Sequence, residues 1–393
     1  MLQELQPAQF ERVRSLFQAL DYHLYLFAVI EGKSPGQIFV DDVSAPRVAL
    51  IWDHAESGCY LGGDYHDPAL YQALNTTILD TIRLQAKTRD LVEVVLNYTP
   101  DGWEEQLPVV LAGLNPLQEW RQHFVMRSPP ALDWRAALPA GYTVCMVDEA
   151  FLARTDLKNI ERLQNWNGSP FRHHLQALMG GALGCCVVAR DTIASWCLGD
   201  CAAGTAVEVG IHTAEDYRQQ GLATIAVAAT VETCLANGAT QVGWHCWSSN
   251  LASAATARKI GFQQTIEHPV YFAWFNPVDN WAVQGNINYL SRKDYVAATQ
   301  AYSQAFRLLA AGHPDAADVQ AANHPWTYYN AAGAWARLGK LEAALHHLQQ
   351  AVDKGFTAVE HLQHNPDFVA LHTFPQWSGL LAQLQTPTNQ PTT

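Results

Sequence analysis

The pattern of hydrophobic and polar positions separates the chain into three blocks. Residues 1–130 and 131–277 both mix short apolar runs of strand length with longer segments of helical spacing. Residues 278–385 carry helical spacing, and residues 386–393 are polar and contain proline, so we expect a disordered tail there. This order predicts an α/β (α+β) fold class, with two tandem mixed-sheet lobes flanked by helices and then an all-α domain.

The first block contains four predicted strands and two predicted helices. Acidic and glycine-containing turns, such as Asp41-Asp42 and Glu56-Ser57-Gly58, separate the short apolar runs. We expect strands at Gly36–Asp41, Arg47–Trp52, Cys59–Gly62 and Leu91–Leu96, and helices at Pro7–Leu20 and Pro68–Lys87.

The second block follows a proline-containing linker around residues 128–141. Its apolar runs predict a hairpin that turns at Arg190-Asp191 and a last strand that closes the lobe. We expect strands at Tyr142–Val147, Cys185–Arg190, Thr192–Leu198, Ala206–Thr213, Gln241–Cys246 and Val270–Phe275, and helices at Glu149–Leu163, Phe171–Leu178, Leu222–Leu235 and up to Ile260.

The third block contains a repeated helical pattern. Asp294-Tyr295-x-x-Ala298-x-x-x-Tyr302-x-x-Ala305 reappears as Lys340-Leu341-x-x-Ala344-x-x-x-Leu348-x-x-Ala351. Small residues at fixed helical positions allow two helices to pack closely, which resembles tetratricopeptide repeats. The copies begin 46 residues apart, at 294 and 340, and not at the usual ~34, so we expect a loop at residues 311–325 between them.

Composition and charge exclude several classes of partner. The chain has 393 residues, of which 24 are basic and 37 acidic, so the formal net charge is −13. A basic stripe of the kind that binds nucleic acid is absent from the sequence, and we expect no nucleic-acid partner. An acidic surface favours cationic partners such as amines.

The eight cysteines form no C-x-x-C pair, and most lie within apolar segments. We therefore expect buried free thiols in a reducing compartment, with neither a disulfide framework nor a metal site. The first residues are mostly polar and do not resemble a signal peptide, and no apolar run approaches the ~18–20 residues of a membrane span. These features predict a cytoplasmic protein without a membrane partner.

The segment after the predicted strand Ala206–Thr213 is the most informative part of the chain. It continues as Arg218-Gln-Gln-Gly221-Leu-Ala223 into a helix of small apolar residues. Unpaired amides at the start of a helix and its positive dipole end attract anions, and glycine allows close approach of the backbone. The pattern predicts a site for a diphosphate, although the same residues could form only a helix cap with a surface arginine.

Arg218-x-x-Gly221-x-Ala223 resembles the acetyl-CoA motif of the GNAT superfamily of acyltransferases. The resemblance continues through the strand Gln241–Cys246, Asn250-x-x-Ser253 and the helix end Lys259-Ile-Gly261-Phe262. The first block, which has no such motif, resembles a degenerate GNAT-like lobe. Its segment 29–42 is similar to the family that includes the zwittermicin-resistance acetyltransferase.

The resemblance implies an acetyl-CoA site without a metal. The backbone of Ile211, His212 and Thr213 would bind the pantetheine arm, and Arg218 would add positive charge near the diphosphate. Asn250 and Ser253 would contact the cofactor, although Asn250 is also suited to cap a helix. The amides that would hold the diphosphate are those of Gln219, Gln220, Gly221, Leu222, Ala223 and Thr224.

Glu208 is the leading candidate for the catalytic base. The resemblance places a glutamate that acts as a base on this strand, but Glu208 could instead point to solvent or pair with an arginine. His212 and His245 are weaker candidates, since a lone histidine on a strand is more often a core residue. The tyrosine that serves as acid in many GNAT enzymes is here Ala257, and Tyr271 is a candidate replacement.

These features together predict an N-acetyltransferase in which an amine of a small molecule or peptide attacks acetyl-CoA directly. Antibiotic, amino acid, polyamine and peptide N-terminus all remain open as acceptors, and a loop at Trp166-Asn-Gly168 could help select among them. The alternative is a non-catalytic sensor of acyl-CoA. In that case the helices of residues 278–385 would bind a protein partner.

Overall fold

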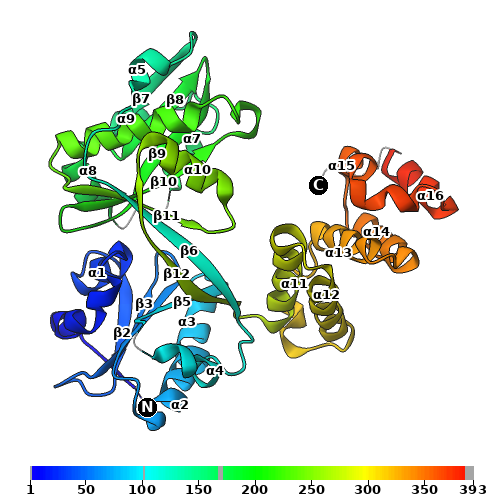
Figure 1. The fold of residues 1–393 in the computed structure, drawn as a ribbon, viewed down its shortest axis with the longest axis horizontal. Helices are drawn as coiled ribbons and strands as arrows, with labels where there is room; N and C mark the ends of the chain where they lie inside the picture. Colours follow the sequence, from blue (N-terminus) through cyan, green and yellow to red (C-terminus); the bar gives the residue numbers. More distant parts are fainter. Residues whose placement is uncertain (1, 101, 167–170, 386–393) are drawn as a thin grey trace. The chain divides into compact units, whose positions relative to one another are not determined.

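The computed structural model describes residues 2–100, 102–166 and 171–385 (Figure 1). The predicted tail at 386–393 and part of the loop at Trp166-Asn-Gly168 lie outside the described residues. The chain forms two compact units, of which the first comprises residues 1–112 and 118–272 and the second residues 113–117 and 273–393. The predicted domain boundaries at 130 and 277 stay predictions. Within the described part of the chain, every helix is too short or too polar to cross a bilayer.

The first unit is built on one mixed sheet flanked by helices. The predicted fold class is confirmed, but the strands that were predicted for two tandem lobes belong to this single sheet. The described residues contribute twelve strands in the order β1-β2-β3-β4-β5-β12-β6-β11-β10-β9-β8-β7. The strands are β1 (Gln3–Glu4), β2 (Gly36–Val40), β3 (Val48–Asp53), β4 (Gly58–Gly63), β5 (Glu93–Tyr98), β6 (Leu117–Met126), β7 (Tyr142–Met146), β8 (Gly184–Ala189), β9 (Thr192–Ala203), β10 (Ala206–Thr213), β11 (Gln241–Trp247) and β12 (Gln263–Trp274).

The sheet has two halves, which exchange strands. We call β1–β5 the first half and β7–β11 the second half. β6 follows the first half in the chain but pairs with β11 of the second half, whereas β12 follows the second half and lies between β5 and β6. The predicted closing strand Val270–Phe275 therefore does not close its own lobe. β6 was not predicted, because its mixed polar pattern is half-buried and resembles a loop.

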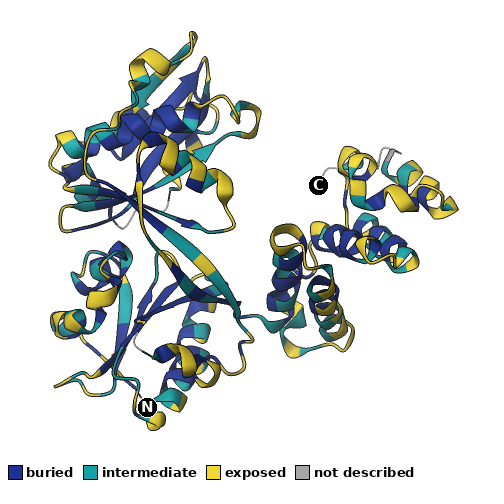
Figure 2. Cartoon of the chain, viewed as in Figure 1, coloured by how far each residue is buried: buried dark blue, intermediate teal, exposed yellow. Residues whose placement is uncertain are grey.

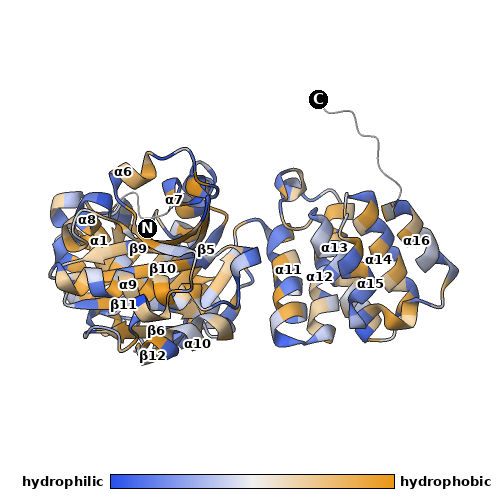
Figure 3. Cartoon of the chain, turned by 90° about the horizontal axis from the view of Figure 1, so that it is seen from above, coloured by the Kyte–Doolittle hydropathy of each residue, from blue (hydrophilic) through white to orange (hydrophobic). Residues whose placement is uncertain are grey.

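Helices cover the sheet, and one of them links the two halves. α1 (Leu24–Ile30) belongs to the first half in sequence but contacts β9 as well as β3. The longest helix of the first unit, α9 (Leu222–Ala236), packs on β8 and β9, and its hydrophobic residues are visible in Figure 3. Most strand residues in the middle of the sheet are buried (Figure 2). The remaining helices of this unit are η1 (Pro7–Leu20), α2 (Pro68–Thr76), η2 (Thr77–Ile82), α3 (Arg83–Lys87), η3 (Trp103–Glu105), α4 (Leu107–Val110), α5 (Trp134–Ala137), α6 (Glu149–Leu152), α7 (Ile160–Gln164), α8 (Arg172–Leu178), η5 (Glu215–Tyr217) and α10 (Leu251–Ile260).

Two predicted helices differ from the structure. η1 is a 3₁₀ helix rather than an α-helix, and it is interrupted at Phe17, whose φ of −116° and ψ of 18° are not helical. The predicted helix Glu149–Leu163 consists of two short helices, α6 and α7. The break comes before α7, where Asn159 has a φ of 67°, a left-handed conformation that a continuous helix cannot contain.

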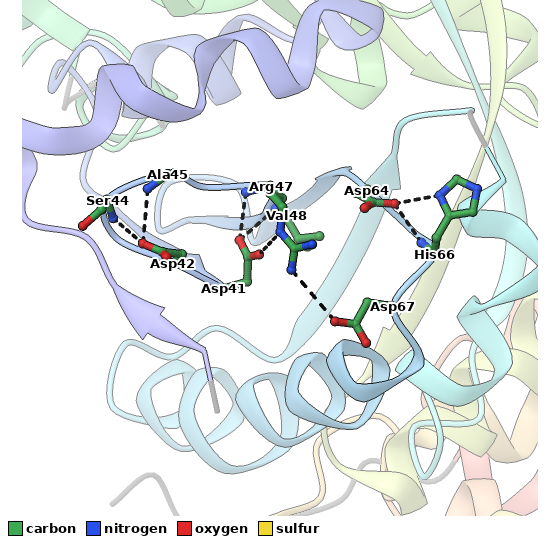
Figure 4. A network of polar contacts seen from close by, with 9 residues as sticks. All are labelled: Asp41, Asp42, Ser44, Ala45, Arg47, Val48, Asp64, His66 and Asp67. Carbon is green, nitrogen blue, oxygen red and sulfur yellow. Dashed lines mark hydrogen bonds and ion pairs between the residues drawn. The ribbon is translucent and has the colours of Figure 1, made fainter.

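Two acidic residues close the turn between β2 and β3, where the sequence predicted a turn (Figure 4). An Asp42 carboxylate oxygen accepts a hydrogen bond from the amide of Ser44 at 2.6 Å. Asp41 accepts from the amides of Arg47 and Val48 at 2.9 and 3.0 Å. Aspartate commonly stabilises turns in this way, by binding amides a few residues further along the chain.

The described residues of the second unit are mostly helical. Alanines that the repeat pattern placed at close helix contacts are fully buried, among them Ala298 and Ala344. Tyr302 packs where a side chain at Gly285 would collide with it, so α11 and α12 approach closely. The likeness to tetratricopeptide repeats stays a prediction. The helices are α11 (Pro277–Ile287), η6 (Asn288–Arg292), α12 (Tyr295–Ala310), η7 (Pro314–Asp318), α13 (Pro325–Arg337), α14 (Leu341–Asp353), α15 (Val359–His364), η8 (Pro366–Leu371) and α16 (Pro375–Gln385).

Candidate active site

The candidate site begins where β10 and β11 part. The two strands pair in parallel only from Ala206 to Glu208, although both continue beyond that point, β10 to Thr213 and β11 to Trp247. A bulge in the pairing of β10 with β9 lies at the same place, between Glu208 and Val209. The ladder therefore leaves backbone groups of residues 209–213 without a partner on β11, as the resemblance implied.

A cavity of about 270 Å³ lies at this divergence. Both halves of the sheet contribute to its wall, because α1, β4 and β5 supply residues as well as β10 and β11. Four of the predicted site residues line it, namely Glu208, Ile211, Asn250 and Ser253. The full lining comprises His23, Leu24, Tyr25, Glu56, Gly58, Tyr60, Val95, Asn97, Arg121, Asp200, Glu208, Val209, Gly210, Ile211, Trp244, His245, Cys246, Trp247, Asn250 and Ser253.

Glu208 is buried in the wall of this cavity, and only 4% of its surface is exposed. Its Oε1 lies 2.7 Å from Nδ1 of His245, while Oε2 has no hydrogen-bond partner among the described residues. Burial raises the pKa of Glu208 to about 7, against the opposing effect of His123 and Arg121. Glu208 thus neither points to solvent nor pairs with an arginine, the two alternatives that the sequence left open.

Four histidines from distant parts of the sequence gather beside Glu208. His123 on β6 lies directly opposite His245 on β11, and their ring centroids are 4.3 Å apart. His23, immediately before α1, lies 5.1 Å from His245 and 5.0 Å from His268 of β12. Burial lowers the pKa of His123 and of His268 to about 3, so both rings are neutral. Sequence analysis considered only His245 among these four, because the exchanged strands bring the others together.

A second cavity, of about 510 Å³, lies next to the predicted diphosphate loop. Arg218 lines it, together with two cations that sequence analysis missed, Lys158 and Arg162. Arg162 Nη1 lies 3.3 Å from Nε2 of His212, whose ring stacks on Trp196. The side chain of His212 therefore belongs to this cavity and not to the wall around Glu208. Lys158 and Arg162 belong to a loop and a short helix without a recognisable motif. The lining comprises Lys158, Asn159, Arg162, Thr192, His212, Ala214, Glu215, Asp216, Tyr217 and Arg218.

The diphosphate loop has the geometry of an anion site. Gly221 occupies the cap position of α9 with a φ of 78°, and no side chain caps this end of the helix. Gln219 also has a positive φ, of 62°, and Arg218 donates from Nε to the carbonyl of Thr213 at 3.4 Å. Residues 218–221 are exposed, so the free amides at the start of α9 face outward with the positive end of its dipole.

Within this loop, backbone and side chains play different parts. The side chains of Leu222 and Thr224 are buried, so these residues can meet a ligand only through their amides, whereas Ala223 is half-buried. Gln220 accepts a hydrogen bond from the hydroxyl of Tyr142 at 2.8 Å, which ties the loop to β7.

Asn250 and Ser253 sit at the start of α10. The Asn250 side chain accepts from the amide of Ser253 at 3.1 Å, and so caps the helix as expected. The Ser253 hydroxyl accepts from the indole N–H of Trp244 at 3.0 Å. Both residues also line the first cavity, so a structural role and a contact with a ligand are compatible.

The structure does not bring Tyr271 together with Glu208. Tyr271 lines neither of the two cavities, and its ring lies 6.1 Å from that of Tyr98 in the first half. Its role as an acid stays a prediction without geometric support. Ala257, at the position where the family has its usual tyrosine, is fully buried in the core.

Comparison with known proteins identifies a family. The sequence model of the GNAT acetyltransferase family matches residues 14–271, which include β2 to β11 and end before α11. The chain is 22% identical over 275 residues to an uncharacterized N-acetyltransferase, YdfB, of Bacillus subtilis (strain 168). That alignment covers 70% of this chain and 99% of YdfB.

Solved structures resemble this chain at low sequence identity. A GCN5-related N-acetyltransferase-like protein from Streptococcus suis is 18% identical, with a TM-score of 0.46, over 68% of this chain and 98% of that one. A tandem GNAT protein from the clavulanic acid biosynthesis pathway is 12% identical, with a TM-score of 0.43, over 70% and 99% of the two chains.

Proposed function

Since the chain belongs to the GNAT acetyltransferase family, we propose that it moves an acetyl group from acetyl-CoA to an amine of a small molecule or peptide. The observation that carries the proposal is a buried carboxylate with one free oxygen, Glu208, at the point where β10 parts from β11. The uncapped start of α9 lies at the far end of the same strand and loop.

The proposed acetyl-CoA site combines backbone amides with a few cations. The backbone of Ile211, His212 and Thr213, which has no partner on β11, suits the amides of the pantetheine arm, and the amides of residues 219–224 suit the diphosphate. Arg218, with Lys158 and Arg162 in the second cavity, supplies positive charge for the phosphate groups of the cofactor. The site therefore needs no metal to neutralise phosphate.

Glu208 is proposed as the base that removes a proton from the acceptor amine. An amine with a pKa near ~10 is mostly protonated at neutral pH, and the neutral form costs roughly 4 kcal/mol to reach. A buried carboxylate with a pKa of about 7 is well matched to that transfer. His245 holds Oε1, so Oε2 remains to face the acceptor, and His245 acts as a positioning residue.

Direct attack is proposed, without an enzyme-bound acetyl group. Cys246 lines the first cavity, but burial raises the pKa of its thiol, which keeps it protonated and poorly nucleophilic. The CoA thiolate has an intrinsic pKa near that of cysteine, ~8.5, so it can leave without full protonation. The lack of a tyrosine at Ala257 is therefore compatible with turnover.

The burial of Glu208 favours an enzyme over an acyl-CoA sensor. A carboxylate with an unpartnered oxygen in a buried wall costs folding free energy, and binding of acyl-CoA at α9 does not require it. A sensor would be more stable with an apolar residue at this position. A role as the catalytic base explains why this position holds a carboxylate despite its cost in folding free energy.

Release of free thiol tests the proposal. Purified full-length protein is incubated with acetyl-CoA and a panel of amines that includes amino acids, polyamines, amino sugars and peptide N-termini. We expect thiol release that depends on at least one amine and falls strongly in Glu208→Gln. Glu342→Gln, at an exposed position of α14, is the matched control. Acetyl-CoA binding without amine-dependent thiol release would instead support the sensor.

A further inference from the structure

We propose that His23, His245 and His268 bind a divalent transition metal ion of the Zn²⁺ class beside the first cavity, whose wall includes His23 and His245. The three residues come from the start of α1, from β11 and from β12, and no two of them are close in sequence. Their ligand atoms lie within 4.8 Å of one another.

Each of the three rings has a buried nitrogen that lacks a partner. Nε2 of His23, of His245 and of His268 makes no hydrogen bond within the described part of the chain. Buried polar atoms are nearly always paired in folded proteins, so three unpaired nitrogens at one place point to a common ligand.

Glu208 contacts Nδ1 of His245, the ring nitrogen that would not bind the metal, as carboxylates commonly do for histidine ligands. When Glu208 is ionised, it can accept only an N–H from the ring, and the 2.7 Å contact with Nδ1 then leaves the lone pair of His245 on Nε2. Histidines that bind metals commonly donate their other ring N–H to a carboxylate, which fixes the tautomer and makes the ligand more basic. The carboxylate also offsets the charge of a bound cation.

The donor set defines the class of metal. Three imidazoles suit Zn²⁺, Cu²⁺ or Ni²⁺, whereas Mg²⁺ and Ca²⁺ prefer oxygen ligands. Three histidines with a further open position are also the ligand set of many zinc sites that hold a water molecule.

The three rings do not share one orientation. The His268 ring is nearly perpendicular to His23 and to His245, at 87° and 84°, whereas His23 and His245 are nearly parallel, at 8°. The described residues include no hydrogen-bond partner for Nε2 of any of the three rings, so no such bond has to break when the rings adjust to an ion.

A second triad is less suitable. His123, Glu208 and His245 also bring their ligand atoms within 4.8 Å. However, the buried nitrogens without a partner among the described residues include none of His123, whose Nδ1 lies 2.7 Å from the Thr265 hydroxyl. The cysteine spacing predicted no metal site, and our proposal departs from that prediction because its ligands are histidines that only the fold assembles.

Metal titration of the full-length protein tests the site without any measurement of turnover. The chelator-treated protein is titrated with Co²⁺, followed by visible absorption, and with Zn²⁺, followed by competition with a chromophoric chelator. We expect one equivalent of either ion, a Co²⁺ spectrum typical of nitrogen ligands, and a higher melting temperature with Zn²⁺. The absence of binding or of the Co²⁺ spectrum in the wild-type protein would overturn the proposal.

Two variants and one control locate the ion. His23→Gln and His268→Gln should each weaken Zn²⁺ binding by at least ~100-fold. Loss of a residue that only hydrogen-bonds to a metal ligand already weakens binding by up to ~100-fold, and loss of a ligand itself should cost at least as much. His66→Gln, which changes an exposed histidine bound to Asp64, should bind as the wild type does. Circular dichroism shows whether each variant is folded. Unchanged affinity in either folded ligand variant would contradict the site, as would loss of binding in the His66 control.

Discussion

The two halves of the sheet contain the same βαβ unit, but only one of them has the features of a cofactor site. In the first half, β4 leads through α2 and α3 to β5, and in the second half β10 leads through α9 to β11. Both strand pairs are parallel. The difference lies in the connection from the first strand to the helix of each unit and in the pairing of the two strands. The same βαβ topology therefore has the features of a cofactor site in the second half, whereas the described residues of the first half lack them.

The helix starts differ in charge and in capping. Asp67 caps α2, accepts from the amide of Ala69 at 3.0 Å and lies 3.9 Å from Arg47 (Figure 4). This carboxylate occupies the place where a phosphate would bind and would repel it. Gly221 leaves the start of α9 without a side-chain cap, and Arg218 is close in sequence. The positive dipole end of α2 is thus capped by a carboxylate, which stabilises that helix. The positive dipole end of α9 has no side-chain cap and remains available to an anion.

The strand pairs differ in how far they stay together. β4 and β5 pair at four successive positions, from Gly58 with Val95 to Leu61 with Tyr98. β10 and β11 pair at three positions and then part, although both strands continue. A continuous ladder satisfies its own backbone groups, whereas parted strands leave groups free for a ligand. The first half therefore contributes wall residues to the cavity but no backbone site of its own.

The largest expected effect concerns the buried carboxylate of the second half. Glu208→Gln removes the proposed base and keeps the shape of the side chain, so turnover should fall by ~10²–10⁴-fold, the usual contribution of a general base. Affinity for CoA, measured by calorimetry, should stay nearly unchanged because Glu208 is not part of the diphosphate loop. Equal turnover of Glu208→Gln and wild type at neutral pH would remove Glu208 from the mechanism.

The start of α9 can be converted to resemble that of α2. Gly221→Asp places a carboxylate beside the proposed diphosphate, and Gly221→Asn is the neutral control of the same size; both residues tolerate a positive φ better than most. We expect CoA affinity to fall by ~100-fold for Asp and by less than ~10-fold for Asn, since the added carboxylate repels the phosphates and the amide does not. If the two variants bind CoA equally, charge at this helix start does not distinguish the halves.

The buried carboxylate of the first half should affect stability and not chemistry. Asp53 is fully buried, and its oxygens accept hydrogen bonds from Ser34 and from the amides of Ala55 and Glu56. Asp53→Asn turns one acceptor into a donor that faces these donors, which should cost ~1–3 kcal/mol of unfolding free energy. Urea denaturation measures the cost, and turnover per folded molecule should not change. A large loss of turnover in the folded variant would show that the first half takes part in chemistry.

The smallest expected effect is a difference in CoA affinity between variants of two arginines. Arg218 precedes the start of α9, and Arg47 lies near Asp67 at the start of α2. Arg218→Gln should weaken CoA binding by ~3–10-fold, with a smaller difference at high salt, because the arginine is exposed and its charge is screened. Arg47→Gln, its counterpart beside Asp67, should leave CoA binding unchanged and cost at most ~1 kcal/mol of stability. CoA binding that depends equally on both arginines would contradict a cofactor site confined to the second half.

Local features of this kind were accessible from the sequence. The motif around Gly221 and the strands before and after it predicted the loop, the helix and the strand pair correctly, because turn, cap and apolar run are encoded within a few neighbouring residues. Asn250 could likewise be recognised as a cap. Lys158 and Arg162 could not be found, since their side chains reach the second cavity from a loop and a short helix without periodicity.

The sequence by itself determined the class of fold, the family resemblance and the position of the loop that we propose to bind the diphosphate, because each depends on local spacing and backbone conformation. Tertiary structure decided which side chains meet beside the first cavity. His123 and His268 lie on the exchanged strands β6 and β12, and His23 precedes a helix of the first half that packs on β9 of the second. Contacts between residues so far apart in the chain depend on strand order and helix packing, which no short window of sequence contains.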